Sequence, residues 1–177
     1  MQTNAPMGVL EKPALTVTVR RVAAPAECAE VVALHRAVFP PDEVARTIYG
    51  ADGAARYLSN LIAFGALQTE YLYLGAWLGD SLAGYVQCRS LEDSWHLNNI
   101  AVLPALQGVG IGRLLWEHYC AAGRERGRRR LTLDVEGNNA AAIAWYQRQG
   151  MWPAERSWRY EKCCLPSPAA VREVELL

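Results

Sequence analysis

Alternation of apolar and polar residues predicts β-strands along much of the chain. Residues 15–22 read Leu-Thr-Val-Thr-Val-Arg-Arg-Val, an alternating run that is rich in β-branched side chains. Gly79-Asp80 separates two later apolar runs, which is the pattern of a β-hairpin. The strands predicted after the first are residues 71–78, 81–89, 96–102, 130–135, 154–165 and 170–176.

Between the predicted strands, apolar residues recur with the helical period of 3.6. The predicted helices are residues 25–38, 42–49, 52–67, 110–126 and 138–149. Pro40 and Pro41 follow the first helix and end it, because proline lacks an amide donor and restricts the residue before it. Gly150 supplies the C-terminal stop of the last helix.

The order of these elements predicts the fold class. Three consecutive antiparallel strands follow the N-terminal helices, and helices and strands then alternate toward the C-terminus. This order is typical of an α+β protein with helices packed on a mixed sheet, and it lacks the strict alternation of a doubly wound fold. Residues 1–13 show no periodic pattern and are predicted to be a flexible leader, so residues 14–177 form a single domain.

Composition and charge narrow the class of protein. The chain has 177 residues, with 18 basic and 18 acidic side chains, and this balance argues against a nucleic-acid partner. Its five cysteines include no C-x-x-C pair, which favours reduced thiols and no metal site. No segment approaches about 18 consecutive apolar residues. We therefore expect a cytoplasmic protein with no membrane partner.

Residues 100–115 carry the most informative motif, in which a strand, a short loop with three glycines and a helix follow one another. Amides at a helix start have no intrahelical acceptor and lie at the positive end of the helix dipole, and glycine lets a phosphate approach them. A Walker loop needs Lys and Ser or Thr where Arg113-Leu114 stands. A Rossmann fingerprint needs a different glycine spacing from Gly108-x-Gly110-x-Gly112. From the loop alone, a flexible turn without a ligand is the remaining alternative.

The loop resembles the signature of the GNAT acetyltransferase superfamily. Gln107-x-x-Gly110-x-Gly112 fits the pattern Q/R-x-x-G-x-G/A, preceded by the expected strand and proline. The resemblance implies a mixed, mostly antiparallel sheet splayed at strands 4 and 5 and flanked by helices, with acetyl-CoA as cosubstrate. It also implies that Ile100, Ala101 and Val102 line the pantetheine arm. The residues that would surround the pyrophosphate are Gln107, Gly108, Val109, Gly110, Ile111, Gly112 and Arg113.

A second motif lies on the last predicted helix. Asn139-x-x-Ala142-x-x-x-Tyr146-x-x-x-Gly150-Met151 resembles the N-x-x-A-x-x-x-Y-x-x-x-G-F element of the same family. Asn139 and Tyr146 are two helical turns apart and share a face, which the resemblance places along the thioester end of the cofactor. Segments 131–146 and 34–40 are most similar to bacterial N-terminal acetyltransferases of ribosomal proteins.

Acetyl transfer to an amine requires a base for the amine, a donor for the oxyanion and a proton for the departing thiolate. The resemblance implies that Tyr146 is the acid. Two residues are candidates for the base: Asp134, at the position of a glutamate in the ribosomal-protein enzymes, and His96, near the position of the catalytic glutamate in histone-type enzymes. The chemistry needs no covalent intermediate, so no cysteine is assigned as a nucleophile.

These motifs predict an acetyl-CoA-dependent N-acetyltransferase that acts on a primary amine by direct attack in a ternary complex. The acceptor is either a small molecule or a peptide N-terminus, and residues 39–69 are predicted to shape its pocket. The alternative is a non-catalytic acyl-CoA-binding module of the same fold. The sequence leaves the acceptor, the acyl length and the oligomeric state open, a homodimer included.

An arginine-rich run at residues 123–130 offers positive charge far from the glycine loop. A continuous helix between the two would separate them by roughly 20 Å. We therefore predict that the run complements the C-terminal end of that helix and contacts no phosphate.

Overall fold

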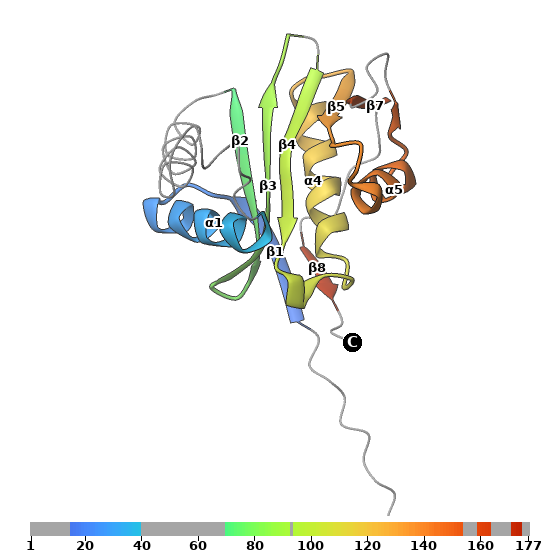
Figure 1. Cartoon of the computed structure of the whole chain (residues 1–177). Coiled ribbons are helices and arrows are strands. Elements are labelled where there is room, and N and C mark those ends of the chain that lie inside the picture. The colour runs from blue at the N-terminus through green and yellow to red at the C-terminus, as the bar shows by residue number, and fades with distance from the viewer. Residues whose placement is uncertain (1–14, 40–69, 93, 154–158, 164–170, 175–177) are drawn as a thin grey trace, which may run out of the picture.

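The computed structural model describes residues 15–39, 70–92, 94–153, 159–163 and 171–174 (Figure 1). The helices are α1 (Pro25–Val38), α4 (Ile111–Glu125) and α5 (Ala140–Arg148), with a 3-10 turn η1 (Pro104–Leu106). The strands are β1 (Leu15–Arg21), β2 (Tyr71–Leu78), β3 (Ser81–Ser90), β4 (Ser94–Val102), β5 (Arg130–Asp134), β6 (Trp152–Pro153), β7 (Arg159–Cys163) and β8 (Val171–Val174). The predicted leader and the predicted helices at 42–49 and 52–67 lie outside these residues.

All eight strands form one sheet in the order β6-β7-β5-β4-β3-β2-β1-β8. The pairing of β4 with β5 is parallel, and the other pairings between described strands are antiparallel. The α+β class and the mixed, mostly antiparallel sheet are therefore confirmed. Strand β8, near the C-terminus, pairs with β1, which is near the N-terminus.

The C-terminal part of the sheet differs from the sequence prediction in one respect. Strand β7 lies within the strand predicted over 154–165, whose residues 154–158 and 164–165 are outside the described residues. The two-residue strand β6 before it was not predicted. Pro153 lies in β6, at the edge of the sheet. An edge position suits proline, which has no amide to donate to a second neighbour.

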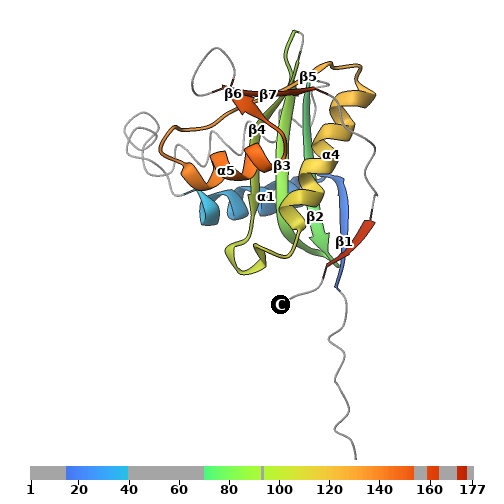
Figure 2. The same cartoon turned by 90° about the vertical axis from the view of Figure 1, so that its right-hand side faces the viewer.

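The helices cover opposite faces of the sheet (Figures 1 and 2). On one face, α1 packs through Val31 and Leu34 against a core that includes Tyr73, Trp77 and Tyr85. On the other face, α4 contributes the larger core, and α5 lies beside it. The core residues of this second face include Val86, Cys88, Trp95, Leu97, Leu114, Leu115, Trp116, Tyr119, Leu131 and Leu133.

Helix α4 is buried over a wider arc than its apolar stripe predicts, because α5 covers its flank. The ring of Trp116 lies 5.7 Å from that of Trp145 and 6.0 Å from that of Tyr146, both on α5. Near its C-terminal end, α4 lies close to the sheet. A Cβ atom on Gly123 would lie 2.8 Å from Leu131 Cδ2 and 2.9 Å from Trp95 Cδ1, so only glycine fits there without rearrangement. Among the described residues, no helix is long and apolar enough to cross a membrane.

Candidate functional site

The central parallel pair separates partway along its length. Strands β4 and β5 are in register from Ser94 opposite Arg130 to Leu97 opposite Leu133. Beyond this point, Asn99–Val102 stay paired with β3 but have no described strand partner on the β5 side. The splay expected between strands 4 and 5 is therefore present, and it leaves main-chain groups of β4 for a ligand.

A β-bulge marks the point where the splay begins. On β3, Cys88 pairs with Leu97 and Gln87 pairs with Asn99, so Asn98 is the extra residue of the bulge. The side-chain oxygen Oδ1 of Asn98 is buried without a hydrogen-bonding partner. A bulge adds twist to a strand and ends regular pairing, which gives a physical reason for the separation at this position.

The glycine loop after β4 presents backbone amides. Gly108 and Gly110 have φ angles of 83° and 95°, a region that favours glycine. The first backbone hydrogen bond of α4 runs from Leu114 N to Gly110 O at 3.0 Å, so the amides before Leu114 have no intrahelical acceptor. Gln107 Nε2 donates to Val102 O at 3.1 Å. This bond ties the loop to the end of β4 and gives the motif glutamine a structural role.

The second motif forms the N-terminal end and one face of α5. Asn139 is the N-cap, and its Oδ1 accepts a hydrogen bond from Ala142 N at 3.1 Å. Tyr146 packs beside Trp145, with ring centroids 5.2 Å apart. Burial raises the pKa of Tyr146 to about 12, because the phenolate would lose hydration. Tyr146 therefore stays protonated at neutral pH and can act as a donor.

A pocket of ≈ 540 Å³ joins the splayed strand, the glycine loop and α5. The predicted cofactor residues that line it are Ile100, Ala101, Val102, Gln107, Gly108, Gly110, Gly112, Arg113, Asn139 and Tyr146. Val109 and Ile111 are not among its lining residues, and the side chain of Ile111 is buried in the core. Their predicted roles concern main-chain amides, and these stay predictions.

Four residues of the pocket were not among the predicted cofactor residues, although Phe39 begins the range 39–69 that was predicted to shape the acceptor pocket. Ala142 and Trp145 lie on the same helix as the motif residues Asn139 and Tyr146, so helical spacing could have indicated them. Val38 and Phe39 come from the end of α1, about sixty positions earlier in the chain. No local pattern connects them to the glycine loop, and only the packing of α1 on the sheet brings them there.

The lining of this pocket offers groups that could hold a cofactor with a polar arm and phosphates. A Cβ atom on Gly108 or Gly110 would meet nothing within 4 Å, so there is open space beside both glycines. Arg113 adds a positive charge at the pocket, and its Nε also donates to Glu117 Oε1 at 3.1 Å. An unpaired strand edge, an amide-rich helix start and a cation together suit a polar arm followed by a pyrophosphate.

The two candidate bases lie side by side at the closed end of the splay, and neither lines the pocket described above. Trp95 and Leu97 belong to the core under α4, so His96 between them points to the face that α1 covers. His96 Nδ1 is 3.0 Å from Thr132 Oγ1, and His96 Nε2 is 3.9 Å from Asp134 Oδ2. From the sequence, His96 and Asp134 were alternative candidates for the base, whereas the parallel pairing of β4 with β5 makes them neighbours.

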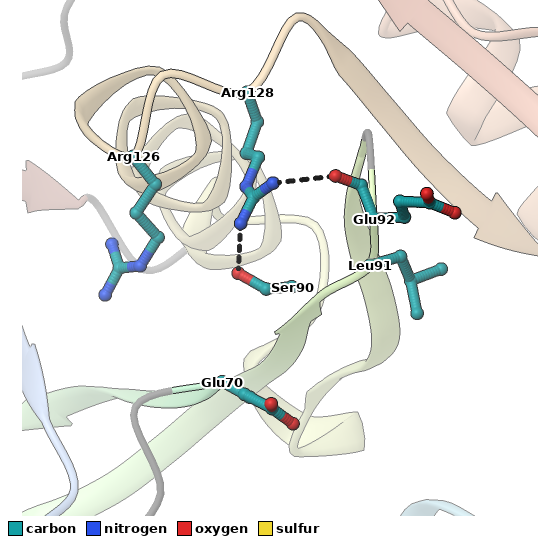
Figure 3. A pocket seen from close by; sticks show the side chains of 6 residues that line it. All are labelled: Glu70, Ser90, Leu91, Glu92, Arg126 and Arg128. Carbon is teal, nitrogen blue, oxygen red and sulfur yellow. Dashed lines mark hydrogen bonds between the residues drawn. The ribbon is translucent and has the colours of Figure 1, made fainter.

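The arginine-rich run lies at the opposite end of α4, beside a second hollow of ≈ 520 Å³ (Figure 3). Arg126 donates to Ala122 O at 3.0 Å, and its guanidinium lies 4.8 Å from the ring centroid of Trp95. Arg128 donates to Glu92 O and to Ser90 Oγ, which connects the loop after α4 to the β3–β4 turn. Arg126 therefore complements a carbonyl at the C-terminal end of α4, as predicted for the run, whereas the contacts of Arg128 with the β3–β4 turn were not predicted.

Three buried cysteines have packing roles. Cys28, Cys88 and Cys120 are free and buried. Burial raises the pKa of the Cys28 and Cys88 thiols, which disfavours the nucleophilic thiolate. Within the described ranges, no three or more His, Cys, Asp or Glu side chains gather in a group that could hold a metal ion.

Comparison with curated proteins finds N-acetyltransferases. The [ribosomal protein bS18]-alanine N-acetyltransferase of Salmonella typhimurium is 39% identical over 87 residues, which are 49% of this chain and 59% of that protein. The protein of the same name from Haemophilus influenzae is 30% identical over 115 residues, covering 63% of this chain and 75% of that protein. Streptothricin acetyltransferase of Streptomyces lavendulae is 34% identical over 113 residues, covering 64% and 54% respectively.

Solved structures show the same fold. The ribosomal-protein-S18-alanine N-acetyltransferase of Escherichia coli has a TM-score of 0.63 at 22% identity, and the match covers 86% of this chain and 96% of that protein. The PaiA N-acetyltransferase of Thermoplasma acidophilum, solved in complex with coenzyme A, has a TM-score of 0.69 at 16% identity and covers 83% of this chain and 98% of its own. At these identities the likeness concerns the fold alone.

The family model described as "Acetyltransferase (GNAT) family" matches residues 32–151. This range begins within α1 and ends just after α5, so it includes β2 to β5, the glycine loop and Tyr146. It therefore covers both sequence motifs and most of the described sheet. The chain belongs to the acetyltransferase (GNAT) family.

Proposed function

We propose that this protein is an acetyl-CoA-dependent N-acetyltransferase that moves an acetyl group to a primary amine by direct attack in a ternary complex. The observation that carries the proposal is the single pocket that joins the unpaired edge of β4, the glycine loop and Tyr146. Each of these features supplies a function that acetyl transfer needs. The family of the chain and the names of its curated relatives support the same chemistry.

Binding depends on main-chain groups in this proposal. The β4 edge at Ile100, Ala101 and Val102 pairs with the pantetheine arm as a neighbouring strand would, and amides from Gln107 to Arg113 surround the pyrophosphate. Asn139 lines the pocket from the start of α5. The bound cofactor supplies an acetyl group activated as a thioester. These contacts hold it in one orientation, so that the acetyl carbon lies near the acceptor amine.

Tyr146 is the proposed donor to the departing thiolate. Its pKa of about 12 keeps the phenol protonated throughout the neutral range. A thiol has a pKa near ~8.5, so complete transfer of the phenol proton to a free thiolate is unfavourable. The hydroxyl therefore acts by a hydrogen bond that strengthens as negative charge develops on sulfur. The aromatic packing around Tyr146 holds that hydroxyl in place.

The acceptor is a primary amine of one of two classes. The relatives' names give one of each: an alanine of ribosomal protein bS18, and streptothricin. A peptide N-terminus and a small molecule place different demands on the surface around the splay. Residues 39–69, which we expect to shape the acceptor pocket, include Asp42, Glu43 and Asp52, whose carboxylates would attract an ammonium group.

The direct test is isothermal titration of the full chain with acetyl-CoA, followed by a mass-spectrometric screen of alanine-initiated peptides and of streptothricin for acetylation. We expect binding in the micromolar range or tighter and acetylation of at least one acceptor. An absence of binding at high micromolar acetyl-CoA would refute the proposal. Tight binding with no acetylation across a broad amine panel would instead favour the non-catalytic acyl-CoA-binding module.

A further inference from the structure

Four polar side chains meet on the α1 face of the sheet, at the closed end of the splay. His96 and Thr132 are partners in the parallel pair, with His96 Nδ1 and Thr132 Oγ1 3.0 Å apart. Thr132 Oγ1 is also 3.4 Å from Ser94 Oγ, to which it donates. On the other side of the ring, His96 Nε2 is 3.9 Å from Asp134 Oδ2. His96, Ser94 and Thr132 are buried, while the Asp134 side chain is 40% exposed.

This arrangement accommodates a charged imidazolium ring. When both ring nitrogens carry protons, Nδ1 donates a hydrogen bond to Thr132 Oγ1. The Thr132 hydroxyl in turn donates a hydrogen bond to Ser94 Oγ. The Nε2 proton then faces the Asp134 carboxylate. A buried histidine can hold a positive charge only where both donors have acceptors and a counter-charge is near. His96 has a hydrogen-bond partner at Nδ1 and a counter-charge in Asp134, whose Oδ2 lies at ion-pair distance from Nε2.

We propose that Asp134 and His96 form one proton relay. Asp134 accepts a proton from the acceptor ammonium, and His96 then accepts that proton at Nε2. The inference rests on the proposed acetyl transfer and deepens it, because it assigns the two candidate bases to successive steps. Thr132 and Ser94 are positioning residues, which fix the ring through Nδ1 so that Nε2 faces Asp134. Neither hydroxyl touches the acceptor.

Proton affinities explain why a carboxylate alone is a weak base for this reaction. A peptide α-ammonium has a pKa of about 8, an unperturbed aspartate one of about 3.9 and a histidine one of about 6.5. Transfer to aspartate is therefore unfavourable by about four units, and transfer to histidine by about one and a half. A relay that ends on His96 removes most of this difference. It serves an α-amine better than a side-chain amine, whose pKa is about 10.4.

In the proposed step, an N–H bond of the ammonium breaks and an O–H bond to Asp134 forms, while the electron pair stays on the amine nitrogen. Asp134 Oδ2 lies 3.9 Å from His96 Nε2, so the partly exposed carboxyl first turns toward the ring. It then donates the proton to Nε2, which restores the carboxylate beside the new imidazolium. After acetyl transfer, the proton returns to solvent through the exposed Asp134. The step changes no oxidation state and needs no additional reactant.

Other charged groups around His96 set the strength of this relay. Arg89 on β3 is directly opposite His96, and a cation there disfavours the imidazolium. On β7, the positions in register with Thr132 and Asp134 are Glu161 and Arg159. From α1, His35 contacts Tyr85 on the same face of the sheet. Asp134 is the carboxylate that lies beside Nε2, so its removal should have a large effect on His96.

The first test measures His96 directly and needs no acceptor. The chain has three histidines, so ¹⁵N-histidine-labelled protein gives three resolvable rings, and His96→Gln assigns the signal. Long-range ¹H–¹⁵N spectra as a function of pH report which nitrogen carries the proton. We expect Nδ1 of His96 to stay protonated while Nε2 titrates, and Asp134→Asn to lower the His96 pKa by about one unit. His35 serves as the internal control and should be unchanged.

Thr132 offers a matched pair of variants. Thr132→Val keeps the side-chain shape and removes the hydroxyl, so His96 should populate both neutral tautomers and its pKa should fall. Thr132→Ser restores the hydroxyl and should restore the single tautomer. A role for Thr132 in packing alone would give the opposite ranking, because valine fills the space better than serine. An Asp134→Asn variant with an unchanged His96 titration would overturn the relay.

The second test is the pH profile of kcat/KM with acetyl-CoA and an alanine-initiated peptide. We expect His96→Gln to lower kcat/KM by about tenfold or more and to abolish the fall of kcat/KM at low pH. Its affinity for acetyl-CoA should be unchanged. If His96→Gln has the same kcat/KM and the same pH profile as the wild-type protein, the relay is contradicted and the proposed function still stands. Wild-type protein that binds no acetyl-CoA would contradict the proposed function itself, whatever the histidine spectra show.

Discussion

The glycine loop and the His96–Asp134 pair lie at opposite ends of the same splay and are built in different ways. The loop offers backbone amides, and its shape depends on positive φ angles at Gly108 and Gly110. The pair consists of side chains from two strands, and its geometry depends on their parallel register. A binding site made of main-chain groups can be recognised from a local sequence motif. A proton-transfer site made of side chains from two strands depends on how those strands pair in the tertiary structure.

Tyr146→Phe should separate chemistry from cofactor binding most clearly. We expect turnover to fall by about a hundredfold or more, because the hydroxyl acts only as charge develops on sulfur. Affinity for acetyl-CoA, measured by isothermal titration, should change by less than about twofold, since the ring still packs against Trp116. Because the pKa of Tyr146 is about 12, no alkaline loss of wild-type activity through this group is expected below pH 10. Unchanged turnover would remove Tyr146 from its role.

Gly110→Ala should break the loop while sparing the His96–Asp134 pair. Its φ of 95° is strained for any residue with a Cβ atom, and relaxing it moves the amides that face the phosphates. A strain of about 1–2 kcal/mol corresponds to a loss of about five- to thirtyfold in acetyl-CoA affinity. Gly79→Ala is the matched control, because Gly79 has a φ of 58° in the β2–β3 turn. It should lower stability and leave the dissociation constant unchanged.

Gly123→Ala tests the packing that supports both ends of the splay. The added methyl would lie 2.8 Å from Leu131 and 2.9 Å from Trp95, so α4 must move away from β4 and β5. Overpacking of this kind costs about 1–3 kcal/mol, which thermal denaturation should report as a lowered Tm. Gly137→Ala is the control, since its Cβ would meet nothing within 4 Å. Equal Tm values for the two variants would argue against tight packing at Gly123.

Arg126→Met should have the smallest effect and tests whether the arginine-rich run contributes to the cofactor site. The guanidinium contacts Ala122 O and the Trp95 ring at the far end of α4. We expect a stability loss below about 1 kcal/mol by chemical denaturation and no change in acetyl-CoA affinity. A marked loss of affinity would mean that positive charge at the far end of α4 helps to bind the phosphates.

Most of the fold could be predicted because its strands and helices carry strong local patterns. The alternating run at residues 15–21 predicts β1, and the turn at Gly79-Asp80 predicts the hairpin of β2 and β3. The short strand β6 was missed, because two residues around Pro153 give no periodic signal. The full burial of Trp116 depends on α5 covering a flank of α4, so the helical pattern of α4 alone does not indicate it.

The amino-acid sequence by itself determined the family and the glycine loop. Gly108 and Gly110 act through backbone conformation, and a helix such as α5 has fixed spacing, so both motifs can be recognised without knowing what packs against them. Only the tertiary structure decided that His96 meets Asp134 and Thr132. Strand β5 follows β4 after a loop and a whole helix, and the register of a parallel pair is set by packing of both strands on α4.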